Sequence, residues 1–239
     1  MHSYQHPALV DAEAEVGLVE EIDRQLLNNI QTQLNKVIAG SDLEGVEYRD
    51  LIVEGHLIDA TKKVLHHDTV DLVVMGTKGA TGIADFLGSN TSRLISETNF
   101  PVLVVPEQAQ YISPKNILFA SDYHRVKATE LKPLVELAKI NHAEIHILHI
   151  GNNRQMRSDE IQTAQTQERL LKTVRHTYHF INTGDVIEGI NHYTGDHKID
   201  MVAALARRHN LVDRVFKKSI SKKMALHTSL PLLVMSEQP

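Results

Sequence analysis

The sequence predicts an α/β protein built from two copies of one parallel-sheet unit, the first copy lacking its opening strands. Placing Gly55 over Gly184 brings the apolar runs of the two halves into register. In each half, short apolar runs alternate with segments of helical periodicity, which is typical of a parallel sheet covered on both faces. Only the second half has a further strand, helix and strand ahead of the shared part.

Three pairs of runs match between the copies as strands. They are 50–53 with 179–182, 71–75 with 200–204, and 99–105 with 229–235, the last after one extra residue in the second copy. The second copy opens with two more strands, at 116–122 and 143–150. The first copy begins at Met1, roughly level with the end of the second of these strands. Most of two strands and a helix are therefore missing from it.

Helices are expected between the strands. A long amphipathic helix is indicated by apolar residues at steps of three and four: Val16, Val19, Ile22, Leu26, Ile30, Leu34 and Val37. Shorter helices are expected at 57–66, at 89–98 and at the matching places in the second copy. The helix between the two opening strands turns its apolar residues inward, with Pro133 near its start. The linker is 107–113, so we expect domains at 1–108 and 114–239.

Composition excludes several classes of protein. The chain has 239 residues, is 42% hydrophobic, carries a net charge of -5 and contains no cysteine. Disulfides and thiolate metal sites are therefore excluded, and the mild negative charge disfavours nucleic-acid and acidic-membrane partners. No apolar run approaches the roughly 20 residues of a membrane helix, and residues 1–10 do not look like a signal peptide. We expect a cytoplasmic protein.

A glycine-rich loop follows the strand at 71–75. It runs from Gly76 through Gly79 to Gly88, and Ser89 is placed to cap the next helix. Glycines let backbone N–H groups approach phosphate oxygens, and a helix N-terminus favours anions. The loop has neither the Walker ending nor the dinucleotide-binding spacing. The alternative is a glycine-rich turn followed by an ordinary helix cap.

At these residues the sequence resembles the universal stress protein family in its tandem form, with two domains in one chain. The family's loop reads Gly, two residues, Gly, nine residues, then Gly-Ser or Gly-Thr, after a strand that often ends Met-Gly. The resemblance implies an open parallel sheet in the order 3-2-1-4-5, whose last strand commonly pairs two domains. It also implies ATP as the cofactor and a homo-oligomer. The candidate binding residues are Met75, Gly76, Gly79, Gly88, Ser89 and Asn90.

The two copies depart from the family pattern in different ways. In the first copy, eight residues rather than nine separate Gly79 from Gly88. In the second copy, the three glycines are replaced by Leu205, Arg208 and Lys218. ATP-binding members also hold adenine partly with an aspartate that ends the first strand. Only the second copy has a counterpart, Asp122, which we interpret as a cap for the helix that follows.

We therefore expect nucleotide-linked sensing or regulation, with no catalytic or metal-binding residues. The main alternative is a dimerisation or partner-binding module that binds no nucleotide, and slow ATP hydrolysis is a third possibility. The fifteen histidines are interpreted as scattered surface or half-buried residues rather than metal ligands. The missing opening would leave the fourth strand of the first copy with an open edge. We consider three explanations: the third strand lies beside the fourth, a strand of another chain pairs with the open edge, or the natural sequence begins upstream of Met1.

Overall fold

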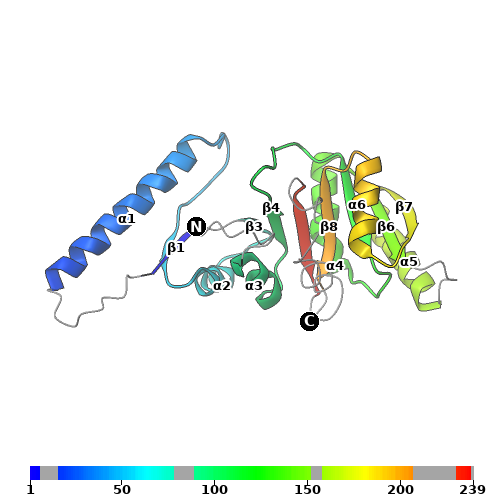
Figure 1. Cartoon of the computed structure of the whole chain (residues 1–239), viewed down its shortest axis with the longest axis horizontal. Coiled ribbons are helices and arrows are strands. Elements are labelled where there is room, and N and C mark those ends of the chain that lie inside the picture. The colour runs from blue at the N-terminus through cyan, green and yellow to red at the C-terminus, as the bar shows by residue number, and fades with distance from the viewer. Residues whose placement is uncertain (6–15, 78–88, 152–157, 207–229, 238–239) are drawn as a thin grey trace. The chain divides into compact units, whose positions relative to one another are not determined.

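The computed structural model describes residues 1–5, 16–77, 89–151, 158–206 and 230–237. It divides into two compact units, Met1–Thr69 and Val70–Pro239. Figure 1 labels most of their helices and strands and colours the chain from the N-terminus to the C-terminus. No helix among the described residues has the length and apolar character needed to cross a membrane.

The first unit holds a two-stranded parallel sheet and two helices. Its elements are β1 (His2–Tyr4), α1 (Val16–Ala39), β2 (Ile52–Glu54) and α2 (Leu57–His67). In the sheet of the first copy, His2 lies opposite Ile52. The repeat aligns Ile52 with Ile181, and Ile181 lies opposite Ile150 in the second copy. Residue His2 therefore occupies the place of Ile150, close to the end of a second strand. The strand pairing therefore agrees with the alignment of the two copies.

The second unit is built on one seven-stranded sheet in the order β3-β4-β9-β8-β5-β6-β7. Its strands are β3 (Val73–Gly76), β4 (Val102–Val105), β5 (Asn116–Ser121), β6 (Glu144–Gly151), β7 (Arg175–Asn182), β8 (Met201–Ala206) and β9 (Leu232–Ser236). Its described helices are α3 (Ser89–Glu97), α4 (Ala128–Asn141), α5 (Ser158–Leu171) and α6 (Val186–Asp196). Helices α2 and α6 each contain 11 residues and begin two residues after the aligned glycines. This supports the repeat.

The second copy has the complete sheet that the resemblance implies. Strands β7, β6, β5, β8 and β9 follow one another in space and are all parallel, which is the order 3-2-1-4-5. Parallel strands of this kind are buried on both faces, and β5 and β9 accordingly consist of buried residues after Asn116. The predicted fold class is thus confirmed.

The last strands of the two copies pair with each other. Strand β4 runs antiparallel to β9, which is the red strand beside it in Figure 1. Val102 lies opposite Val234, and Leu103 lies opposite Leu233. Strands β3 and β4 of the first copy thereby extend the sheet of the second. The pairing of two domains through their last strands is therefore confirmed, and it occurs within one chain.

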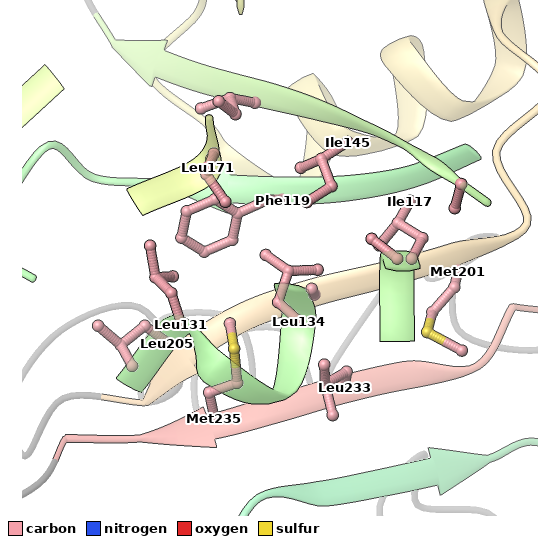
Figure 2. Close-up of a cluster of buried hydrophobic side chains, with 14 of the residues drawn as sticks. Ile117, Phe119, Leu131, Leu134, Ile145, Leu171, Met201, Leu205, Leu233 and Met235 are labelled. Carbon is pink, nitrogen blue, oxygen red and sulfur yellow. The ribbon is translucent and has the colours of Figure 1, made fainter. Parts of the chain in front are cut away.

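The main core lies between the sheet and α4 and α5. Phe119 on β5 and Leu131 and Leu134 on α4 are at most 2% exposed, and Figure 2 shows them facing one another. The same cluster includes Leu233 on β9 and Leu205 on β8. Leu205 occupies the place that Gly76 has in the first copy, so this position of the second copy serves packing.

Two expectations about the start of α4 are wrong. Pro133 is the sixth residue of the helix, counting from Ala128, and so lies in its interior. Asp122 does not cap α4, because the helix begins only at Ala128 and the backbone N–H of Lys127 donates to Glu130 Oε2 (2.8 Å). Asp122 Oδ1 instead accepts from the His124 N–H at 3.0 Å, an interaction within the turn after β5.

The open edge of the first copy remains in the structure. Strand β2 pairs with β1, and β3 pairs with β4. Within the described part of the second unit, β3 is the end strand of the seven-stranded sheet. Val74 on β3 is 60% exposed, whereas the equivalent strand β8 lies between β5 and β9.

Candidate functional site

The candidate site lies at the carboxyl end of β3. Met75 and Gly76 are the last two residues of the strand and lie opposite Val104 and Val105 of β4. The N–H of Thr77 donates to the Val105 carbonyl at 3.1 Å, which continues the ladder by one residue. The chain therefore leaves the sheet just after Thr77, where the glycine-rich loop begins. Ligands of open α/β sheets bind at this end of the strands.

Helix α3 is tied to the same strand end by Thr91. Its Oγ1 donates to the Gly76 carbonyl at 3.1 Å, and the residue is 2% exposed. Thr91 belongs to the first turn of α3, which begins at Ser89, while Asn90 is exposed to solvent. The start of α3 thus lies near the end of β3. This is the arrangement that favours a bound anion.

The structure brings together only some of the predicted site residues. Met75, Gly76, Ser89 and Asn90 lie at the end of β3 and the start of α3. Gly79 and Gly88 lie outside the described residues. Across the described ranges, no three histidine, aspartate or glutamate side chains are grouped so as to hold a metal ion.

In the second copy, side chains of the domain itself pack around the carboxyl end of β5. Tyr123 follows β5 in a left-handed conformation (φ 52°), and its ring stacks on that of His149 with centroids 4.3 Å apart. Burial, helped by the charge of Glu160, raises the pKa of Tyr123. Gln167 of α5 donates to the Ser121 hydroxyl at 2.9 Å in the buried interior. The first-strand aspartate is therefore followed by a packed turn in this chain.

The sequence interpretation missed one cluster of polar residues. His146 on β6, His179 on β7, and Tyr193 and His197 at the end of α6 lie in mutual contact. Their positions show no motif spacing, and they meet only because α6 packs on β6. The one signal in the sequence was that two neighbouring strands each carry histidines, which by itself is common on half-buried strands.

The chain is similar to known proteins along nearly its whole length. The sequence pattern of the Universal stress protein family matches residues 3–106 and 114–236. Universal stress protein MJ0577 of Methanocaldococcus jannaschii is 33% identical over 92 residues, which cover 36% of this chain and 57% of that protein. Universal stress protein MJ0531 of the same organism is 33% identical over 103 residues, or 41% of this chain and 61% of that protein.

Solved structures show the same fold. A universal stress protein from Archaeoglobus fulgidus superposes with a TM-score of 0.60 at 14% identity, covering 99% of this chain and 86% of the other. A putative universal stress protein from Pseudomonas aeruginosa superposes with a TM-score of 0.54 at 11% identity, covering 98% of this chain and 91% of the other. The two matched segments follow the two copies of the repeat. The chain therefore belongs to the universal stress protein family, with two family domains in tandem.

Proposed function

We propose that the first domain binds ATP or a related nucleotide at the end of β3 and that the protein acts as a cytoplasmic sensor or regulator. The observation that carries this proposal is the hydrogen bond from Thr91 to Gly76, which holds the start of α3 at the strand end. The glycines of the family loop, Gly79 and Gly88 followed by Ser89, also support it, although eight residues separate the two glycines where the family has nine. In this proposal, backbone N–H groups of the loop and of α3 bind the phosphates.

Each site residue has a physical role in this proposal. Gly76, Gly79 and Gly88 let the backbone approach phosphate oxygens without a Cβ in the way. In this proposal Ser89 and Asn90 contribute hydroxyl and amide groups at the helix start, and Met75 precedes Gly76 at the end of β3. No acid, base or nucleophile is assigned, so we propose binding and regulation rather than rapid catalysis.

Calorimetric titration of the purified full chain with MgATP tests the proposal. We expect saturable binding that Gly88→Val abolishes, because the added side chain blocks the approach of phosphate. The matched control is Lys218→Val, which changes the equivalent position of the second copy and leaves binding intact. Thr91→Val removes the tie to Gly76, so we expect a loss of about 1 kcal/mol in the free energy of unfolding and weaker ATP binding.

The second candidate is an interaction module that binds no nucleotide. It is favoured by Leu205, which replaces a loop glycine in the second domain and is 3% exposed within the core. A folded protein that neither copurifies with ATP nor binds it would support this candidate and exclude the first. Slow ATP hydrolysis is tested with Gly76→Val: phosphate release that persists in this variant does not come from the β3 site.

Assembly with a second copy has a structural constraint. The last strands of both domains are already paired with each other, β4 with β9. A homo-oligomer would therefore have to use another surface. Sedimentation over a range of concentrations measures whether such an oligomer forms, and a constant monomer mass would exclude it.

A further inference from the structure

A cluster of three histidines and one tyrosine lies on the sheet face opposite the main core. Ile145 and Ile147 of β6 point into the main core, so His146 between them points to the other face. Helix α6 packs on that face, where Tyr193 is 3% exposed. We call His146, His179, Tyr193 and His197 the histidine–tyrosine cluster.

The hydrogen bonds of this cluster fit a neutral His146. Its Nε2 lies 3.3 Å from Asn116 Oδ1, and its Nδ1 lies 2.8 Å from the Tyr193 hydroxyl. The amide oxygen of Asn116 can only accept, so Nε2 carries the hydrogen and Nδ1 accepts from Tyr193. The neutral imidazole thus links the start of β5 to α6, with each nitrogen paired.

The rings of the cluster are packed closely. Tyr193 stacks on His197 with centroids 3.9 Å apart, and His179 lies 4.9 Å from Tyr193. His146 lies 5.5 Å from His179 and 6.2 Å from His197. Positive charge on more than one of these imidazoles would be repulsive at such separations.

The surroundings disfavour protonation of two of the histidines. Burial lowers the pKa of His146 from its ordinary value of 6.5. The nearby Glu144 raises this pKa and His197 lowers it, and burial is the largest of the three effects. Burial, together with His146 and His197, lowers the pKa of His179, and Glu144 again opposes. Burial and the nearby Glu144 raise the pKa of Tyr193 to about 12, so its hydroxyl keeps its proton. Among the described residues, Glu144 is the carboxylate whose charge acts on His146, His179 and Tyr193.

We propose that the histidine–tyrosine cluster is a pH-sensitive latch, in which neutral imidazoles hold α6 on β6 and β7 and protonation in mildly acidic solution releases α6. Protonating His146 places a hydrogen on Nδ1, which then donates to the Tyr193 hydroxyl instead of accepting from it, and it puts a positive charge in a half-buried place. Protonating His179 as well adds a second positive charge beside the first. Detachment of α6 exposes His146 and His179 to water, which removes the cost of protonating His146 in a half-buried place and the repulsion between the two charged imidazoles.

The sign of the effect follows from the direction of the shifts. His146 and His179 bind protons less readily while α6 is attached, so attachment is favoured above their ordinary pKa of 6.5. The attachment of α6 weakens as the pH falls from 6.5 through the lowered pKa values of His146 and His179. The pKa of His176 on β7 shifts in the opposite direction. Burial lowers this pKa, but the hydrogen bonds to the Val174 carbonyl and to Glu168 outweigh burial and raise it. Acid therefore strengthens the contact of β7 with α5 while it weakens that with α6.

Hydrogen exchange of the full chain tests the latch. We compare α6 amides with α4 amides at about pH 7.5 and about pH 5.5, after correction for intrinsic rates. Protection of α6 should fall several-fold at the lower pH while that of α4 holds. The double variant His146→Gln, His179→Gln should lose this response, and the control His192→Gln, whose side chain is 69% exposed on the same helix, should keep it.

Two results would overturn the proposal. One is a parallel loss of protection in α6 and α4, which indicates general acid unfolding. The other is an unchanged response in the double variant. Should that variant fail to fold, NMR titration of the imidazole protons of the wild-type chain decides: midpoints for His146 and His179 below the ordinary value support the latch, and midpoints at or above it exclude it. None of these readouts depends on nucleotide binding.

Discussion

Gly189 is the fourth residue of α6, where the helix approaches β6 too closely for a side chain. A Cβ built there would lie 2.9 Å from Cδ1 of Ile150 and 3.0 Å from both its Cγ1 and Cγ2. Carbon atoms normally meet at about 3.5–4.0 Å. Because three atoms overlap, including two near the Ile150 backbone, a change of side-chain rotamer does not relieve the contact. Helix α6 must move away from the sheet.

We therefore expect Gly189→Ala to destabilise the second unit. Overpacking of this kind costs about 1–3 kcal/mol, and three simultaneous contacts place the cost at about 2–3 kcal/mol. The higher helix propensity of alanine offsets about 1 kcal/mol of this loss. The net loss in the free energy of unfolding is about 1–2 kcal/mol. Urea unfolding followed by far-UV circular dichroism measures it as a lower midpoint.

The same helix offers a matched control in Gly195. A Cβ at this position meets no atom within 4 Å, so Gly195→Ala should raise stability by up to about 1 kcal/mol. Adding Ile150→Ala to Gly189→Ala removes all three overlapping atoms, and the pair should show a favourable coupling of about 1 kcal/mol or more. If Gly189→Ala stabilises the protein as much as Gly195→Ala does, the close approach of α6 to β6 is refuted.

Two further predictions concern the sheet. Leu233→Ala should lower the free energy of unfolding by about 3 kcal/mol or more in a urea titration, because the side chain is 0% exposed in the main core; a loss below about 1 kcal/mol would mean that β9 does not close this core. Since the pKa of His176 is raised in the fold, its contribution is present below pH 6.5 and is lost as the pH rises through its folded pKa. His176→Gln should therefore lower the urea midpoint more in mildly acidic than in alkaline solution, and an equal loss at both would refute the pairing with Glu168.

Much of the fold could be predicted from sequence because its signals are local. Apolar runs of strand length and the glycines at 55 and 184 are enough to align the copies, and α2 and α6 form at equivalent positions. The errors at Pro133 and Asp122 have one cause. Both rules for helix starts assume that the helix begins near the marker residue, whereas the start of α4 is defined by the pairing of Lys127 with Glu130.

The candidate site was predictable only as a segment. The glycine spacing and the strand before it identify the end of β3, but nothing in the spacing says that Thr91 would donate to Gly76. The histidine–tyrosine cluster could not be predicted, because its members come from β6, β7 and α6 and are adjacent only after α6 packs on the sheet.

The repeat, the α/β class and the position of the glycine-rich loop could be predicted from the sequence, since each depends on residues close together in the chain. The tertiary structure decided which strands pair across the copies: β4 with β9 in one continuous sheet, and β1 with β2 in another. It also decided that β3 has an open edge among the described residues and that three histidines surround Tyr193. These features depend on backbone pairing and packing between distant segments, which no local pattern encodes.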